Sequence, residues 1–133
     1  MMESLSSQQK AIVKDLLLQI ENAIDNLIEW NEDYCEADDL LKSPSGMKTL
    51  AANCMLIEAI GESIKKIDNK TDGQLLPLRS EIPWNQVKRM RDHIAHGYFD
   101  INVNFIWDVI TNDLEPLREA IRFFIEQISA SKA

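Results

Sequence analysis

Between residues 12 and 30 the chain reads IVKDLLLQIENAIDNLIEW, and this stretch decides the fold class. Its apolar side chains recur at steps of three and four residues, which is the spacing of one face of an amphipathic helix. The members of this stripe are Ile12, Leu16, Ile20, Ala23, Leu27 and Trp30. Ser6 followed by Gln9 has the form of a capping box, so the pattern predicts a long helix that begins near residue 6.

The same spacing continues through the middle of the chain. Ser43-Pro44 is typical of a helix start, and the stripe that follows it is Met47, Leu50, Cys54, Ile57, Gly61 and Ile64. Gly61 lowers helix propensity, so its presence predicts a close contact with another helix. After a connection over residues 69–82, Pro83 opens a third helix that Gly97 ends. The stripe of this third helix is Trp84, Val87, Met90 and Ile94.

The last segment carries the longest stripe, which Asn102 can cap. Its apolar members run from Val103 to Ile128, and Pro116 lies among them. Because proline removes a backbone donor, we expect a kink or a split into two helices there. Only four glycines and four prolines occur, too few for the frequent tight turns of a β-sandwich. The sequence therefore predicts an all-α fold, an antiparallel bundle of four to five helices in a single domain over residues 1–133.

Composition limits the function. With 14 basic and 22 acidic residues the net charge is −8, so any contact with nucleic acid must be confined to a local positive site, and no DNA binding is expected. Cys35 and Cys54 lack metal-ligand spacing, so neither a metal site nor another cofactor is expected. Residues 1–10 lack the apolar stretch of a signal peptide, and no apolar run could span a membrane. We expect a cytoplasmic protein.

One segment stands apart from this acidic background. Residues 88–98 read KRMRDHIAHGY, which is the only dense cationic stretch and holds both histidines of the chain. One interpretation is purely structural: a solvated helix face with a histidine at the helix C-terminus. The concentration of two histidines and three basic side chains within nine positions favours a functional site instead.

Spacing constrains how these side chains can act together. Arg91 and His96 are five residues apart, which separates them by roughly 140° around a straight helix. They can reach one ligand only if the helix ends between them or if a second copy of the chain supplies one of them. Asp92 and His96 are four residues apart and share a face, so the carboxylate can orient the imidazole.

The chemistry of this set suits cleavage of RNA without a metal. Histidine exchanges protons near neutral pH, and a positioned general acid or base accelerates a reaction by about 10²- to 10⁴-fold. Arginine grips phosphate through two parallel hydrogen bonds and stabilises the charge that grows in phosphoryl transfer. The ribose 2′-hydroxyl would be the internal nucleophile.

The same residues resemble a known family. Arg91, four residues, His96, one residue and Tyr98 match the RX4HXY signature of the HepT-like branch of HEPN domains. The resemblance extends over most of the chain, through residues 60–62 (IGE), 82–84 (IPW), Trp107 and 112–114 (NDL). An isolated RX4H occurs often by chance, whereas the ordered set of matches in a helical chain is specific.

This resemblance implies a two-fold homodimeric ribonuclease, the toxin of a type VII-like toxin–antitoxin pair. Carried over, Arg91 and His96 are the catalytic pair and Asp92 the polar residue beside the arginine. Tyr98 matches the tyrosine that a cognate MntA-like nucleotidyltransferase antitoxin modifies with AMP. The RNA substrate would be a tRNA or an mRNA. Many relatives carry Asn where this chain has Asp92.

Two other functions stay open at this point. The first is a non-catalytic substrate-binding or regulatory subunit that docks onto a nucleotidyltransferase, because an acidic helical bundle suits contact with another protein. The second is a dimer that only binds a nucleotide through Arg91.

Overall fold

The structure is a computed structural model that describes residues 5–94 and 100–130. Across these two ranges every regular element is helical, which confirms the predicted all-α class. Of the elements, η2 and η3 are 3-10 turns and η4 is a π-helical turn. In chain order the elements are α1 (Ser7–Trp30), η2 (Ala37–Leu41), α2 (Pro44–Lys70), η3 (Leu76–Arg79), α3 (Trp84–Lys88), α4 (Met90–Ile94), α5 (Val103–Asp108), η4 (Val109–Asp113) and α6 (Leu114–Ala130).

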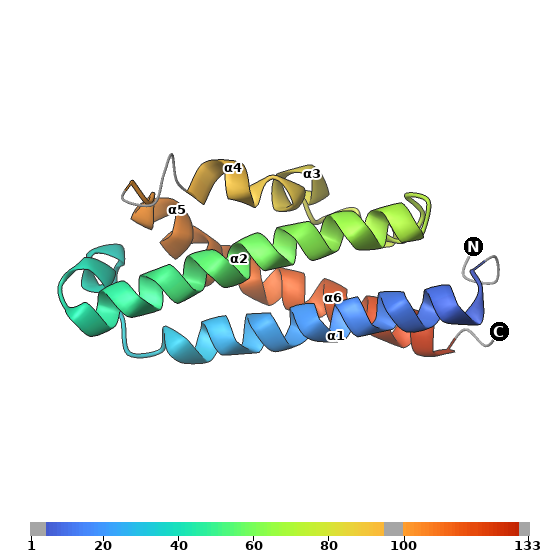
Figure 1. Ribbon diagram of the computed structural model, residues 1–133, viewed down its shortest axis with the longest axis horizontal. Coiled ribbons are helices and arrows are strands. Elements are labelled where there is room, and N and C mark those ends of the chain that lie inside the picture. The colour runs from blue at the N-terminus through green and yellow to red at the C-terminus, as the bar shows by residue number, and fades with distance from the viewer. Residues whose placement is uncertain (1–4, 95–99, 131–133) are drawn as a thin grey trace.

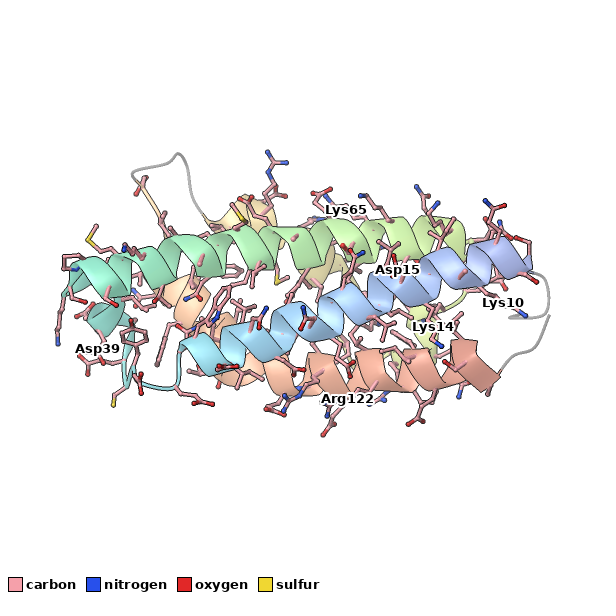
Figure 2. All side chains as sticks on the ribbon, turned by 60° about the horizontal axis from the view of Figure 1, so that its bottom comes forward. Lys10, Lys14, Asp15, Asp39, Lys65 and Arg122 are labelled. Atoms are coloured by element: carbon pink, nitrogen blue, oxygen red, sulfur yellow. The ribbon has the colours of Figure 1, made fainter. Side chains whose placement is uncertain are left out.

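Three long helices form the body of the bundle. Figure 1 shows α1 and α2 lying antiparallel, with α6 running beside α1 and the short helices α3 and α4 lying along α2. Two ion pairs tie α6 to α1 in antiparallel register. Arg118 Nη1 lies 3.0 Å from Asp25 Oδ1, and Arg122 Nε lies 2.9 Å from Glu21 Oε2 (Arg122 is labelled in Figure 2).

The predicted helix starts are confirmed by their caps. The Ser6 hydroxyl accepts a hydrogen bond from the Gln9 backbone N–H at 3.0 Å, and the Gln9 side chain accepts one from the Ser6 N–H at 2.8 Å. Ser43 caps α2 by accepting from the Gly46 N–H, and Asn102 caps α5 by accepting from the Phe105 N–H. Side-chain acceptors therefore satisfy orphan donors at three helix ends, as the sequence indicates.

The buried face of α1 differs from the predicted stripe. Ile12 and Trp30 are 38% and 41% exposed, so they lie outside the core. The run Leu16-Leu17-Leu18 allows two phases of the stripe, and contact with both α2 and α6 selects the second one. The fully or nearly fully buried residues of that phase are Val13, Leu17, Ile20, Ile24 and Leu27.

The third predicted helix is interrupted. Arg89, at φ −107° and ψ 15°, ends α3, and α4 begins at the next residue. All four members of the predicted stripe are nevertheless buried, because the break leaves α3 and α4 on the same side of α2: Trp84, Val87, Met90 and Ile94. None of the helices within the described ranges combines the length and the apolar character needed to cross a bilayer.

Candidate active site

The α3–α4 segment is seated on α2 by close backbone contact. A Cβ placed on Gly61 would lie 3.0 Å from the backbone carbonyl oxygen of Val87, so the glycine lets α3 approach α2, as predicted for this position. The Trp84 indole N–H donates to the Arg79 carbonyl oxygen at 2.9 Å, and the Lys88 ammonium pairs with Asp68 near the end of α2. These contacts fix where the cationic segment begins.

The predicted site residues on α4 face solvent. Arg91 and Asp92 are both exposed, as is Arg89 just before the helix, whereas Met90 and Ile94 are buried against α2. A guanidinium at Arg91 is therefore presented on the surface by a helix that is anchored through its two apolar neighbours. This placement suits the binding of an anion from solution.

His96 and Tyr98 lie outside the described residues, so their predicted roles stay predictions. The described backbone on the two sides of this gap is joined, because the Asn102 N–H donates to the Ile94 carbonyl oxygen at 2.7 Å. The end of α4 and the start of α5 therefore lie next to each other. The convergence of Arg91 with His96, and of Asp92 with His96, is likewise untested.

His93, exposed on α4, packs against an aromatic neighbour. Its ring lies 5.5 Å from that of Phe105 of α5, with the two planes tilted by 42°. Both rings line a cavity of about 440 Å³ that lies between α2, the α3–α4 segment and the start of α6. The basic segment thus has a hollow beside it that the sequence did not reveal.

Two carboxyl groups at this cavity have shifted pKa values. Partial burial raises the pKa of Asp113 above its usual range, and the negative charge of Asp108 adds to the effect. The hydrogen bond from Arg79 lowers the pKa of Glu81, together with a bond to its own backbone. The two acids of the cavity therefore differ, since Asp113 holds a proton more readily than Glu81 does.

A π-helical turn shapes one side of the cavity. Val109–Asp113 adopts this wider winding between α5 and α6, and Pro116 follows in the first turn of α6. Proline cannot donate to the carbonyl of Asn112, so the widened turn lies where the regular ladder would fail. The predicted split of the last helix occurs, and it lies just before Pro116 rather than at it.

Sequence reasoning missed Gln86, Phe105 and Asp113, which join His93 in the cavity lining. They come from α3, α5 and the π-helical turn, and no local motif connects them. Two signals lay near one side of the cavity: the predicted kink at Pro116, and the match over residues 112–114, which contains Asp113 without assigning it a role. Within the described ranges no group of three or more His, Cys, Asp or Glu residues is arranged to hold a metal ion.

Comparison with known proteins identifies relatives over most of the chain. A probable ribonuclease HepT of Thermococcus cleftensis is 34% identical over 105 residues, which cover 79% of this chain and 88% of the relative. A "Putative RNase" of Methanocaldococcus jannaschii is 29% identical over 117 residues, covering 85% of this chain and 90% of that protein. Another of Caldanaerobacter subterraneus subsp. tengcongensis is 24% identical over 90 residues, covering 68% and 74%.

No solved structure matches the chain. The model of the family described as ribonuclease HepT-like matches residues 20–124, which include α4 and the RX4HXY motif. With that match and the archaeal relative above 30% identity, this chain belongs to the HepT-like ribonuclease family.

Proposed function

We propose that this protein is a metal-independent RNA endonuclease of the cytoplasm whose catalytic pair is Arg91 and His96. The observation that carries the proposal is the exposed Arg91 on α4, five residues before His96, in a chain of the HepT-like ribonuclease family. The relatives whose names describe ribonucleases support the reaction class.

The proposed reaction uses the ribose 2′-hydroxyl as nucleophile. His96 takes the hydroxyl proton as the 2′-oxygen forms its bond to phosphorus, and the bond to the 5′-oxygen of the next nucleotide breaks. A proton passes to that leaving oxygen, which leaves a 2′,3′-cyclic phosphate and a free 5′-hydroxyl. Arg91 stabilises the extra negative charge on the non-bridging oxygens. Asp92 is a positioning residue that orients the His96 imidazole.

A homodimer explains how residues on different faces meet. Roughly 140° separates Arg91 from His96 on one helix, whereas a two-fold axis would bring the arginine of one copy to the histidine of the other. It would also concentrate positive charge, which a chain of net charge −8 needs before it can hold RNA. We therefore propose a composite site between two copies.

The decisive test is complementation between inactive variants. In EDTA, purified wild-type protein is expected to cleave a structured RNA such as tRNA, and Arg91→Ala and His96→Ala are each expected to lose about 10²-fold or more. Dimers formed by refolding the two variants together are expected to regain about a quarter of wild-type activity, because half of the dimers carry one intact site.

Lys48→Ala is the control, because it removes an exposed cation near the start of α2, outside the basic segment, and leaves the proposed pair intact. Full cleavage by His96→Ala would contradict the assignment of the general base. Inactivity of the mixed dimers, with both single variants also inactive, would place the pair within one subunit.

We further propose that the activity is that of a toxin and that a nucleotidyltransferase antitoxin silences it by transferring AMP to Tyr98. The added phosphate would place negative charge two residues from His96, where the RNA phosphate must lie. Co-expression with a nucleotidyltransferase encoded nearby is expected to raise the intact mass by one or more AMP units, and Tyr98→Phe is expected to abolish the increase. Co-purification without added mass or RNA cleavage would instead favour a docking subunit.

A further inference from the structure

The cavity beside α4 has the size of a small-molecule site. Its volume of about 440 Å³ lies within the range of roughly 300–1,000 Å³ that ligand pockets occupy. It is open to solvent on the side of His93 and Gln86, both of which are exposed. A ligand can therefore enter without unfolding of the bundle.

The inner walls of the cavity are apolar and firmly held. Ile57 and Ile60 of α2, Val87 of α3 and Leu114 of α6 line it, and each is less than 9% exposed. These apolar walls make no hydrogen bonds to water. They therefore favour a flat or apolar ligand group that displaces water from the cavity.

The mouth of the cavity adds aromatic and polar groups. The rings of His93 and Phe105, tilted against each other by 42°, offer aromatic surface on which a planar ligand can pack. The Gln86 amide can both donate and accept a hydrogen bond, and the Asp113 carboxylate can accept from an amino group. The ligand that fits this combination is planar, aromatic and polar along one edge.

The mouth carries charges of both signs, because Glu81 and Asp113 line the cavity and Arg79 pairs with Glu81 at 2.7 Å. Arg89 and Arg91 are exposed on both sides of Met90, whose side chain lines the cavity. An anionic group attached to the planar ligand can therefore rest on a guanidinium while the ring enters the hollow. A nucleotide combines these two features, with a flat base and a phosphate.

We propose that this cavity binds one nucleobase of the RNA strand, and that Gln86 and Asp113 contact the polar edge of the base. This inference rests on the proposed ribonuclease function and adds a base-binding pocket to it. Because Asp113 is an acceptor when ionised, it favours bases that carry an exocyclic amino group, namely adenine, cytosine and guanine, over uracil.

Binding can be measured without any cleavage. Calorimetric titration of the protein with AMP, CMP, GMP, UMP and ribose 5-phosphate separates the base from the sugar and phosphate. We expect the three amino-bearing nucleotides to bind at least about fivefold more tightly than ribose 5-phosphate, the low end of what one stacked base contributes. UMP is expected to bind more weakly than these three. Equal affinities for ribose 5-phosphate and all four nucleotides would overturn the proposal.

Two variants locate the site. Gln86→Trp places a bulky ring over the mouth and is expected to reduce AMP affinity about tenfold, whereas Asn85→Trp, exposed on the same short helix but outside the lining, is expected to leave it unchanged. Asp113→Asn keeps the shape of the side chain and is expected to reduce the preference for CMP over UMP. Thermal melting of each variant checks the fold.

The outcomes separate this proposal from the ribonuclease function. Tight nucleotide binding that Gln86→Trp weakens, in a protein that cuts no RNA, would support the pocket and reject catalysis. Cleavage of RNA by a protein whose affinity for AMP and ribose 5-phosphate is equal would reject the pocket alone. A Gln86→Trp variant that changes only the molecular mass in solution would assign the groove to contact between protein chains and overturn the base-binding proposal.

Discussion

Lys10 is a lysine placed on the buried face of α1. Its side chain is 6% exposed, and its Nζ has no hydrogen-bond partner among the described residues. The lysine extends the buried stripe of α1 toward the N-terminus, since it lies three residues before Val13, which lies four before Leu17. Figure 2 shows it near the start of α1, with Lys14 one turn further on. A buried ammonium without a partner costs free energy.

Replacing this lysine should stabilise the protein. We expect Lys10→Met to raise the free energy of unfolding in urea by about 1–2 kcal/mol, because methionine keeps the length of the chain and removes the buried charge. Lys14→Met, at a half-buried position one turn away, is expected to change it by less than about 0.5 kcal/mol. A loss of stability in Lys10→Met would mean that the ammonium finds an anion.

Single residues also show the limits of sequence reasoning. The close contact at Gly61 follows from a local pattern, and the structure confirms it. The burial of Lys10 does not follow from a local pattern, because a lysine is seldom buried without a partner. The place of Asp113 in the cavity could not be predicted either. Only the fold brings residue 113 into the same lining as Gln86 of α3.

Among the elements, α1 and α2 are joined by a buried pair of amides. The Asn31 amide N–H donates to Asn53 Oδ1 at 2.9 Å, and the Asn53 amide N–H donates to Asn31 Oδ1 at 3.0 Å. Asn31 also donates to the Leu27 carbonyl oxygen at the end of α1. The pair is sealed from solvent, so it fixes the register of the two helices.

A double-mutant cycle should show strong coupling in this pair. Asn31→Ala and Asn53→Ala are each expected to cost about 2 kcal/mol in urea unfolding, because each leaves a buried amide unsatisfied, and the coupling energy is expected to be about 1–2 kcal/mol. The half-buried Asp25–Arg118 pair between α1 and α6 is the comparison, with coupling below about 1 kcal/mol. Equal coupling in the two pairs would contradict a special role for the asparagines.

The sequence predicts elements better than their interruptions. Caps at Ser6, Ser43 and Asn102 are local signals and are confirmed. The break at Arg89 is not a local signal, because no glycine or proline occurs there and the residues on both sides fit one helical stripe. It arises where α3 and α4 must both lie along α2. The predicted phase of the α1 stripe was also partly wrong, because packing against two helices selects the neighbouring phase.

Charge is distributed unevenly over the whole molecule. Residues 65–91 hold seven of the 14 basic side chains and only three of the 22 acidic ones. They cover the last six residues of α2 and the path through α3 into α4, which lie next to each other in Figure 1. An acidic protein therefore has one region that attracts RNA, and the remainder repels it.

This division predicts a modest dependence of RNA binding on salt. For a labelled RNA with 2′-O-methyl riboses, which cannot be cleaved, we expect fluorescence anisotropy to give a slope of log affinity against log salt of about −1.5 to −3, as for two to four phosphate contacts. Arg89→Gln is expected to make the slope less steep by about 0.7, whereas Lys48→Gln, exposed at the opposite end of α2, leaves it unchanged. Equal effects of both variants would exclude a localised footprint.

The number of residues in the π-helical turn at Val109–Asp113 affects the shape of the cavity. Such a winding holds one residue more than an ordinary α-helical turn, and each residue advances a helix by about 100°. Since α6 is tied to α1 by Arg118 and Arg122, losing that residue would swing α5 and carry Phe105 away from His93. An insertion or deletion at this joint would therefore reshape the pocket by moving Phe105, even where the other lining residues stay the same.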